Sequence, residues 1–455
     1  MTDKPIQSNY IVAIVGRPNV GKSTLFNKIA GQNRAILSDI PGTTRDILYE
    51  QVTWNGFNFT IADTAGIDAD YQAGLERDIF LQTQTAVQGA DLIIFLVDAR
   101  VGQQVEDRKA AELIRKLGKL VILAVNKAEG TRYDNAQHEF YTLGLGEPML
   151  ISAVSGRGVG DILDNIVVQL KKMKKKILKR VQDDKDIIRV AIIGRPNVGK
   201  STLINQLAQK NLALVSDIPG TTRDIVRTTI PAADFNIEIS DTAGLRRRGK
   251  IEKGIEKFSS LLVLRAVNEA DIVLLVIDAD EGILAQDLHI AQIIEEAGKG
   301  VILLINKWDV IEKNASVTSE YDKYLEHKFI FMPWLAKVYI SALTGQRTDK
   351  IIQKIAEVWQ ALQTKIPSKE LNNLIGNASA AIPPKGKRKN PKIYFASQIS
   401  ANPPTIKLKV NYPEELHFSY LRYLDKQLRQ KYPMIGAPIR WQIIKSSSNS
   451  IETTK

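Results

Sequence analysis

GRPNVGKS stands at residues 16–23 of this 455-residue chain and stands again, unchanged, at residues 194–201. Each copy fits the pattern G-x-x-x-x-G-K-[ST], whose glycines let a turn of backbone N–H groups close around phosphate oxygens. The lysine of the pattern reaches the terminal phosphates, and the hydroxyl after it binds Mg²⁺. Because two identical octamers are not a chance match, the sequence predicts two nucleotide sites.

The duplication extends well beyond these octamers. SDIPGTTRDI at 38–47 returns at 216–225, and DTAG at 63–66 returns at 241–244, in both cases 178 positions later. VNKAE at 125–129 matches INKWD at 305–309, and ISA at 151–153 matches ISA at 340–342. Blocks that keep their order with small drifts in spacing indicate a duplicated domain with loop insertions.

Each repeat has the pattern of an α/β domain. Short β-branched runs at 10–15 and 189–193 lead into the glycine turns, and an amphipathic helix pattern follows each turn. Continuous apolar runs of strand length lie at 91–98, 120–125, 271–278 and 301–305. Such runs, alternating with helical patterns, indicate a parallel sheet covered on both faces, with the ligand at the carboxyl ends of the strands.

A chain of this length favours about three domains over one core. After residue 364 the pattern changes to strand-like KIYFASQI, TIKLKVNY and IRWQII, with the helical EELHFSYLRYLDKQLRQKY between them, which predicts a small α+β domain. The first part of the charged segment after residue 170 is expected to extend the preceding helix. The predicted parts are a first nucleotide-binding domain at 9–170, a charged linker at 171–187, a second such domain at 188–364, a basic α+β domain at 365–445 and a flexible tail at 446–455.

The net charge of +12 is concentrated near the C-terminus. From residue 365 to residue 455, sixteen Lys and Arg face five Asp and Glu, an excess of eleven. A concentrated basic segment favours a polyanion partner, most often nucleic acid. A solvated basic surface that keeps the protein soluble is the alternative.

The composition also bears on compartment. The chain has no cysteine, which excludes disulfides and thiolate metal sites and is compatible with a reducing compartment. Its first ten residues lack an apolar signal core, and no apolar run is long enough to span a bilayer. We therefore expect a cytoplasmic protein without membrane contact, and a monomer, because the three domains complement one another.

The repeated blocks assign phosphate and metal chemistry to a few residues. In the first repeat Lys22 contacts the phosphates and Ser23 binds Mg²⁺, while Asp63 holds the ion through water. The N–H of Gly66 would sense the terminal phosphate, and Thr44 is the predicted threonine of the metal shell. The second repeat supplies Lys200, Ser201, Asp241, Gly244 and Thr222 in the same roles.

The INKWD segment predicts guanine recognition. Asp309 can accept hydrogen bonds from the ring N–H and the exocyclic amine of guanine, while Asn306 meets the other edge. Lys307 would lie over the base, and the N–H of Ala342, after Ser341, would meet the guanine carbonyl. Adenine lacks the donor pair, so a carboxylate would be left unmatched. The second repeat is therefore predicted to be a guanine site.

The first repeat departs at Glu129, which follows Asn126, Lys127 and Ala128 where the second repeat ends in aspartate. Glutamate keeps the charge but adds a methylene, so two hydrogen bonds to guanine need a shift of the loop or the base. We expect guanine preference to survive with weaker affinity. Loss of nucleotide discrimination in this repeat is the alternative.

The means of hydrolysis is less evident. Ile67 and Leu245 occupy the positions where many GTPases place a glutamine that orients water, and no arginine finger can be assigned, although arginines fill 246–248. Asn19 and Asn197, inside the phosphate loops, offer a side-chain oxygen that could hold a monovalent cation such as K⁺ near the phosphates. The alternative is that these asparagines only stabilise the turn.

Together these assignments define the predicted site. The predicted catalytic residues are Lys22, Asp63, Gly66, Lys200, Asp241 and Gly244. Predicted nucleotide contacts in the first repeat are Gly16, Arg17, Pro18, Asn19, Val20, Gly21, Lys22, Ser23, Asp63, Thr64, Ala65, Gly66, Ile67, Asn126, Lys127, Ala128, Glu129, Ser152 and Ala153. Those in the second repeat are Gly194, Arg195, Pro196, Asn197, Val198, Gly199, Lys200, Ser201, Asp241, Thr242, Ala243, Gly244, Leu245, Asn306, Lys307, Trp308, Asp309, Ser341 and Ala342.

With its paired GRPNVGKS, PGTTRD and DTAG segments, NKWD and a basic α+β terminus, the chain resembles, over roughly residues 10–445, the tandem GTPases called Der or EngA. The resemblance implies two P-loop GTPase domains and a KH-like C-terminal domain. It also implies a bacterial GTPase that forms GDP and phosphate with Mg²⁺ and acts in assembly of the large ribosomal subunit, with ribosomal RNA as partner. It carries Thr44 and Thr222 over as Mg²⁺ ligands and implies potassium-stimulated hydrolysis, which favours the cation role of Asn19 and Asn197.

Two features depart from this family. One is Glu129, and the other is the C-terminal region, which has no clear GxxG clamp for a nucleotide backbone, since Gly436 begins the nearest glycine turn. Three functions are therefore weighed. The first is a GTP-hydrolysing switch that reorders residues 38–47, 63–80, 216–225 and 241–258. The second is a nucleotide-gated RNA scaffold, and the third is an RNA-modification factor. The missing cysteine and the lack of an added catalytic domain argue against the third.

Overall fold

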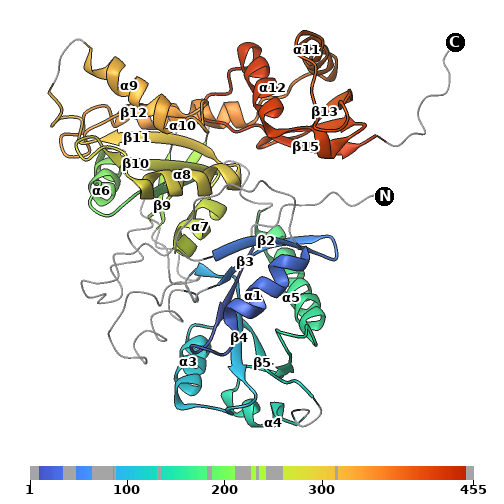
Figure 1. The fold of residues 1–455 in the computed structure, drawn as a ribbon. Coiled ribbons are helices and arrows are strands. Elements are labelled where there is room, and N and C mark those ends of the chain that lie inside the picture. Colours follow the sequence, from blue (N-terminus) through green and yellow to red (C-terminus); the bar gives the residue numbers. More distant parts are fainter. Residues whose placement is uncertain are drawn as a thin grey trace. The chain divides into compact units, whose positions relative to one another are not determined.

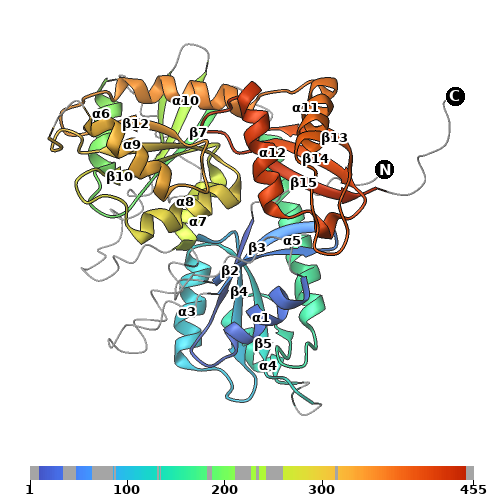
Figure 2. The same cartoon turned by 45° about the horizontal axis from the view of Figure 1, so that its top comes forward.

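The computed structural model describes residues 10–33, 48–63, 86, 89–130, 133, 135–181, 187–210, 227–231, 235–241, 260–312 and 316–446. Within these residues the strands form two six-stranded sheets and one three-stranded sheet (Figures 1 and 2). The chain divides into two compact units. The first unit holds the first sheet together with α7 (Ser260–Glu269), and the second holds the second sheet and the three-stranded sheet.

The first sheet has the strand order β2-β3-β1-β4-β5-β6, in which only β2 runs antiparallel to its neighbour. Its strands are β1 (Ile11–Val15), β2 (Leu48–Trp54), β3 (Phe57–Asp63), β4 (Leu92–Asp98), β5 (Leu120–Asn126) and β6 (Met149–Leu150). The helices are α1 (Lys22–Asn33), α3 (Val105–Lys116), α4 (Gln137–Phe140) and α5 (Val159–Val181). Figures 1 and 2 show α1 and α5 on one face of the sheet and α3 on the other.

The second sheet repeats this plan with the order β12-β11-β10-β7-β9-β8, and again only one outer strand, β8, is antiparallel. Its strands are β7 (Ile187–Ile193), β8 (Arg227–Pro231), β9 (Asn236–Asp241), β10 (Ile272–Asp278), β11 (Gly300–Asn306) and β12 (Ala336–Tyr339). The helices other than α7 are α6 (Lys200–Lys210), α8 (Ala285–Ala297), α9 (Val317–Lys328) and α10 (Asp349–Leu362).

Strands β4 and β10 are apolar up to the aspartate that ends each of them, because both faces of each sheet are covered. Every residue of β4 and of β10 is buried, including the aspartate that ends each strand. This confirms the predicted parallel sheets in both repeats. The strand predicted to start at Arg189 begins two residues earlier, since Ile187 and Ile188 pair with β9.

The C-terminal domain is a three-stranded sheet with two helices. Strand β13 (Ile393–Ala401) runs antiparallel to β14 (Pro404–Val410), which is parallel to β15 (Arg440–Lys445). Helix α11 (Ser368–Ala381) packs on β13, and α12 (Phe418–Lys431) lies beside it. The small α+β domain predicted from the sequence is therefore confirmed.

The observed bounds of three helices add to, or differ from, what the sequence predicted. Helix α11 was not predicted, because its Asn- and Ser-rich sequence masks the apolar positions Leu371, Ile375 and Ala378, all of which are buried. Helix α12 begins at Phe418 and not at Glu414, because 413–415 forms a 3₁₀ turn and the His417 side chain accepts the N–H of Ser419. Helix α5 continues to Val181, as predicted for the first part of the charged segment.

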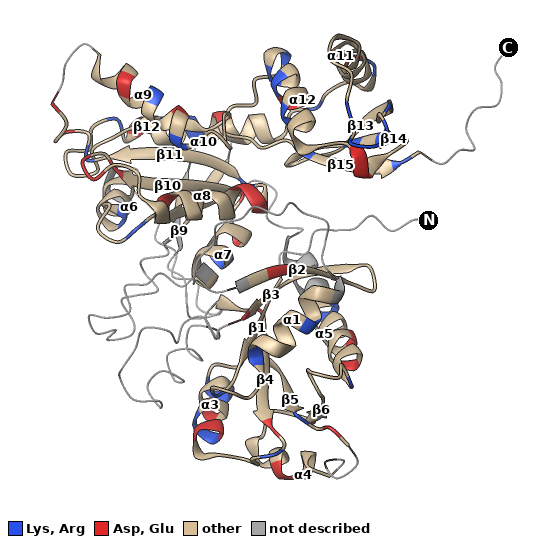
Figure 3. Ribbon diagram, viewed as in Figure 1, with Lys and Arg blue, Asp and Glu red and all other residues tan. Residues whose placement is uncertain are grey.

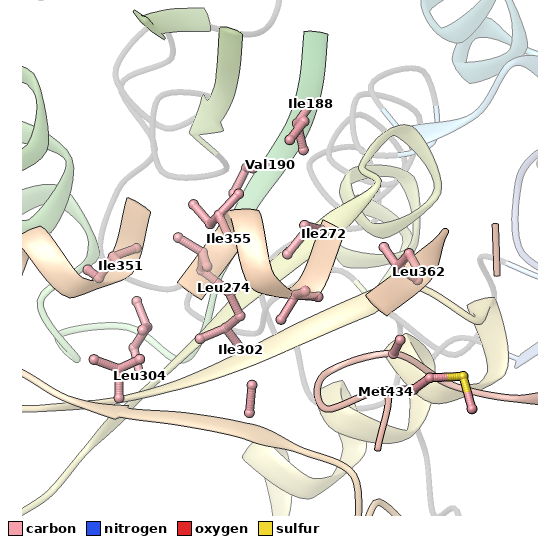
Figure 4. Close-up of a cluster of buried hydrophobic side chains, with 14 of the residues drawn as sticks. Ile188, Val190, Ile272, Leu274, Ile302, Leu304, Ile351, Ile355, Leu362 and Met434 are labelled. Atoms are coloured by element: carbon pink, nitrogen blue, oxygen red, sulfur yellow. The ribbon is translucent and has the colours of Figure 1, made fainter. Parts of the chain in front are cut away.

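One apolar core joins the second sheet to the C-terminal domain. The same buried cluster contains Ile302 and Leu304 of β11, Ile355 of α10, Leu408 of β14 and Met434 before β15. Figure 4 shows Met434 near Leu362 at the edge of this cluster. The C-terminal domain thus shares one hydrophobic core with the second sheet, and the two lie in one compact unit.

The seam between these two domains is also hydrogen bonded. The N–H of Gly436 donates to the Trp334 carbonyl at 2.6 Å, and the N–H of Val301 donates to the Gly436 carbonyl at 2.8 Å. The guanidinium of Arg440 donates to the Glu296 carbonyl at 2.6 Å, at the C-terminus of α8, and burial lowers the pKa of Arg440 to about 10. The glycine turn at Gly436, the nearest one to a GxxG clamp in this region, is therefore part of an internal contact.

Gly436→Ala tests this seam. Gly436 has φ +78°, and an added Cβ would lie 2.4 Å from Val358 Cγ2 and 3.1 Å from the Val301 carbonyl oxygen. We expect a loss of about 2 to 4 kcal/mol in the free energy of unfolding of the second unit, from backbone strain and overpacking. Thermal and urea unfolding of the full chain would measure it.

Gly376→Ala in α11 is the matched control. Its Cβ would meet no atom within 4 Å, so alanine is expected to stabilise the helix by about 0.5 to 1 kcal/mol. Equal effects of the two substitutions would contradict the role assigned to Gly436.

Candidate nucleotide-binding sites

Both phosphate-loop sequences lie at the carboxyl edge of a sheet. The first connects β1 to α1, and the second connects β7 to α6. Lys22 and Lys200 are the first helical residues, and Ser23 and Ser201 follow in the first turn with exposed side chains. A helix N-terminus at this point adds free N–H groups and a favourable dipole for anions.

The two loop lysines are buried against their own loops. Lys22 Nζ donates to the carbonyls of Gly16 at 2.8 Å and Arg17 at 3.0 Å. Lys200 Nζ donates to the carbonyls of Gly194, at 2.8 Å, and Arg195. Each ammonium therefore lies inside the curve of its loop, where a positive charge can neutralise phosphate.

The second glycine of each loop makes room for an asparagine from the NKx segment. Gly21 has φ +100° and Gly199 has φ +96°, and a Cβ would lie 2.3 Å from Asn126 Nδ2 or 2.2 Å from Asn306 Nδ2. No side chain fits at either position. The glycines are thus required by the approach of the asparagine as well as by the turn.

Each of these asparagines connects two loops. Asn126 Nδ2 donates to the Val20 carbonyl at 2.7 Å, and its Oδ1 accepts the Ala153 N–H at 2.9 Å. Asn306 makes the same pair of bonds, with Val198 at 2.7 Å and with Ala342 at 2.8 Å. Both asparagines are buried, so these bonds fix the phosphate loop relative to the ISA loop.

The N–H of Ala342, which the sequence predicts to meet a guanine carbonyl, donates to Asn306 Oδ1 in this structure. The contact with guanine stays a prediction. Ser152 and Ser341, also in the ISA loops, are fully buried.

The lysines of the NKx segments are held by the aspartates that end β4 and β10. Lys127 Nζ lies 2.7 Å from Asp98 Oδ2 and donates to the Asn19 carbonyl at 2.6 Å. Lys307 Nζ lies 2.5 Å from Asp278 Oδ2, and this hydrogen bond raises the pKa of Lys307. The ends of neighbouring strands are therefore tied together at both sites.

The two carboxylates that the sequence predicts to recognise the base differ between the repeats. Glu129 Oε1 accepts the Ser152 hydroxyl at 2.9 Å, and Oε2 accepts Arg100 Nη2 at 2.7 Å, which lowers the pKa of Glu129. Asp309 is exposed, and within the part of the chain that the structure describes its carboxylate makes no hydrogen bond or ion pair. The acidic side chain is thus engaged in the first site and free in the second.

Aromatic packing supports the NKWD segment of the second repeat. Trp308 is buried, with its ring centroid 4.4 Å from that of Tyr339 and 5.3 Å, edge-on, from that of Tyr321. The first repeat has Ala128 at the place of the tryptophan. The predicted contact residue Trp308 therefore acts as a packing anchor for the loop that carries Asp309.

Sequence reasoning missed the main role of the loop arginines. Arg17 Nε donates to Asp107 Oδ1 at 2.8 Å, and Arg195 Nε donates to both oxygens of Asp287 at 3.0 and 2.9 Å. Both aspartates are fully buried and also accept the backbone N–H that begins α3 or α8. Burial raises the pKa of Asp107 despite the Arg17 hydrogen bond. The only signal in the sequence was that both repeats have an arginine in the phosphate loop and an aspartate at the equivalent later position, Asp107 or Asp287.

Other predicted residues are placed as follows. Asp63 is buried at the end of β3, beside β1. Asn19 and Asn197 have φ +64° and +62° and exposed side chains. The backbone of Asp241 ends β9, and its side chain is outside what the structure describes. Also outside the described residues are Thr44, Thr64, Ala65, Gly66, Ile67, Thr222, Thr242, Ala243, Gly244 and Leu245.

Two phosphate loops, each clamped by an NKx asparagine at the carboxyl edge of an α/β sheet, define a protein with two G domains, the class of P-loop GTPases. A family model described as 50S ribosome-binding GTPase matches residues 11–127 and 189–307. A second model, the KH-domain-like C-terminal domain of EngA bacterial GTPase enzymes, matches residues 365–443. The chain is thus a GTPase with two G domains and a KH-like domain.

Curated relatives match along nearly the whole chain. GTPase Der of Caldanaerobacter subterraneus subsp. tengcongensis is 43% identical over 434 residues, covering 95% of this chain and 98% of the relative. GTPase Der of Chloroflexus aggregans is 44% identical over 437 residues, covering 94% and 96%. The chain belongs to the Der family of GTPases, as the sequence resemblance predicted.

Among solved structures, the chain is similar to Era from Aquifex aeolicus, determined with GDP and AlF₄⁻. The identity is 26%, with 57% of this chain and 93% of that chain covered and a TM-score of 0.30. Within the described ranges, no helix combines the length and apolar character needed to cross a membrane.

Asp287→Ala tests the arginine link of the second phosphate loop. It removes the fully buried partner of Arg195, whose side chain is itself only 9% exposed. We expect the free energy of unfolding of the second unit to fall by about 3 to 5 kcal/mol, because a buried guanidinium loses its main counter-ion. Urea unfolding of the full chain would measure this.

Glu281→Ala is the control on the same arginine. Glu281 pairs with Arg195 Nη1 at 2.9 Å, but its side chain is 52% exposed. Its removal is expected to cost less than about 1 kcal/mol. A similar loss in both variants would show that burial does not govern this link.

Proposed function

We propose that this GTPase acts as a switch in assembly of the large ribosomal subunit, with ribosomal RNA as its partner. The observation that carries the proposal is the core shared by the second G domain and the basic KH-like domain, which links a GTPase site to a candidate RNA surface. The matched family description, 50S ribosome-binding GTPase, supports the same partner. We also propose that the protein is a cytoplasmic monomer. Its domain limits and nucleotide contacts are proposed to be those expected from the sequence.

The RNA side of the proposal is supported by the C-terminal domain. Figure 3 shows Lys and Arg along α12 and on the three-stranded sheet. Lys407 and Lys409 lie on the strand next to the exposed aromatic Phe395, and the Phe418 ring lies 5.1 Å from the Arg422 guanidinium carbon. Basic side chains next to exposed rings suit single-stranded RNA, because phosphates and bases are contacted together.

The proposed hydrolysis uses residues that surround each phosphate loop. Lys22 and Lys200 would neutralise the terminal phosphates, and the N–H groups of Gly66 and Gly244 would contact the γ-phosphate. The asparagine clamp holds the loop in place, so little reorganisation accompanies the reaction. The segments 38–47, 63–80, 216–225 and 241–258, which fall largely outside the described residues, are proposed to reorder with nucleotide state.

The residues present fit Mg²⁺ as a cofactor. The exposed hydroxyls of Ser23 and Ser201, next to the buried lysines, are oxygen donors of the kind that Mg²⁺ prefers. Thr44 and Thr222 would complete the shell, with Asp63 and Asp241 acting through water. Bound Mg²⁺ would neutralise charge that develops on the phosphates.

K⁺ is proposed as a second cofactor, held by Asn19 and Asn197. Both side chains are exposed on a left-handed turn of the loop, so their oxygens can reach an ion beside the phosphates. The same turn geometry also suits asparagine for conformational reasons alone. The two roles therefore need an experiment.

Asn19→Gly with Asn197→Gly separates these roles, because glycine keeps the left-handed turn and removes the oxygen. The unmodified chain is expected to hydrolyse GTP faster in KCl than in NaCl at equal ionic strength. In the double variant we expect this preference to disappear, measured as phosphate release. A variant that keeps its preference for K⁺ would rule out the cation role.

Ribosome association is tested by sedimentation of large-subunit particles with the full chain. We expect binding to differ between a GTP analogue and GDP, and Lys407→Glu with Lys409→Glu to weaken it by about tenfold or more through lost phosphate contacts. Lys323→Glu with Lys350→Glu, at exposed lysines of α9 and α10, is the charge-matched control. Equal binding in both nucleotide states would contradict the switch function and favour the RNA scaffold function.

A further inference from the structure

We propose that Arg100 sets the base specificity of the first nucleotide site by competing with guanine for Glu129. The inference rests on the proposed function, in which Glu129 contacts the base. It concerns a residue outside the repeated motifs, since Arg100 lies just after β4 and belongs to none of the repeated blocks named above.

The sheet places the two side chains together. Asp98 and Asn126, at the ends of β4 and β5, are paired in register, and the N–H of Ala99 donates to the Asn126 carbonyl at 2.8 Å. The N–H of Arg100 then donates to Asp98 Oδ1 at 2.9 Å, which holds the backbone of Arg100 at the strand end. From there Arg100 Nη2 reaches Glu129 Oε2 at 2.7 Å.

Both oxygens of Glu129 are therefore engaged, one by Arg100 and the other by the Ser152 hydroxyl. A guanidinium presents N–H donors on an N–C–N unit in one plane. The ring N–H and the 2-amino group of guanine form the same N–C–N donor unit. Arg100 uses one of these N–H groups, so it takes the place of one of the two guanine donors at the carboxylate.

The second repeat lacks this competitor. Asp280 occupies the place of Arg100 after β10, and its N–H donates to Asp278 Oδ1 at 3.0 Å in the same way. An acidic side chain cannot pair with Asp309, whose carboxylate is unengaged among the described residues. The chain therefore carries two versions of one site, with and without an internal cation.

The consequence is a difference in discrimination. A base that lacks the donor pair is rejected because it leaves the carboxylate unmatched. In the first site Arg100 can supply the missing partner of Glu129. A base without the donor pair therefore loses less binding affinity, and guanine gains less affinity from its contact with Glu129. Arg100 is 53% exposed and Glu129 is 32% exposed, so solvent limits the effect. We expect about a two- to fivefold change in selectivity, as is typical of an exposed ion pair.

The test compares GDP with inosine diphosphate, which keeps the ring N–H but lacks the 2-amino group. The full chain carries Lys200→Ala, so that calorimetry with Mg²⁺ reports the first site. Arg100→Ala is expected to raise the ratio of GDP to inosine diphosphate affinity by about two- to fivefold. Arg100→Lys, which keeps the charge without the planar fork, should give an intermediate ratio.

Two further variants serve as controls. Arg108→Ala removes an exposed guanidinium of the same unit that bonds Gln103 and not Glu129, and it should leave the ratio unchanged. Asp280→Arg, in a chain with Lys22→Ala, introduces the competitor into the second site. It should lower the selectivity of that site for GDP.

The outcomes separate the inference from the function beneath it. If the Lys200→Ala chain binds no GDP, the proposed first site fails. If it binds GDP and neither Arg100→Ala nor Arg100→Lys changes the ratio, the competitor role is wrong while the site stands. If Arg100→Ala lowers the ratio, Arg100 assists guanine recognition, which also overturns the proposal.

Discussion

The contact on which each G domain depends is that between a buried asparagine and the phosphate loop. Asn126 and Asn306 each bond a loop carbonyl and the N–H of the ISA segment, and Gly21 and Gly199 leave the space for them. The glycine pattern, the NKx segment and the ISA segment are thus one physical unit. A side chain on the glycine would separate the loops and with them the site.

The two G domains share this unit but differ around it. The second has a tryptophan packed among tyrosines, an unengaged aspartate and a core continuous with the KH-like domain. The first has alanine, and a glutamate held by Arg100 and Ser152. Duplication has therefore kept the phosphate machinery and varied the base segment. Differences in nucleotide selectivity are expected to arise there.

Much of the fold followed from sequence pattern because the signals were periodic and repeated. The runs of β4 and β10 are apolar up to the final aspartate and buried throughout, as expected of a sheet covered on both faces. Helix α11 was missed because three buried apolar residues are spread among Asn and Ser. The start of α12 was misplaced because a 3₁₀ turn and a histidine cap precede it.

The sequence by itself determined the family, the two phosphate loops and the residues around them, since spacing in the chain is enough to specify a strand, a turn and a helix. Only the tertiary structure decided the pairing of Arg17 with Asp107, the occupation of the Ala342 N–H and the use of Gly436 at the seam. Each of these depends on which distant groups meet across a buried interface. The local sequence pattern does not predict these contacts, because hydrogen bonds between remote segments depend on how the segments pack.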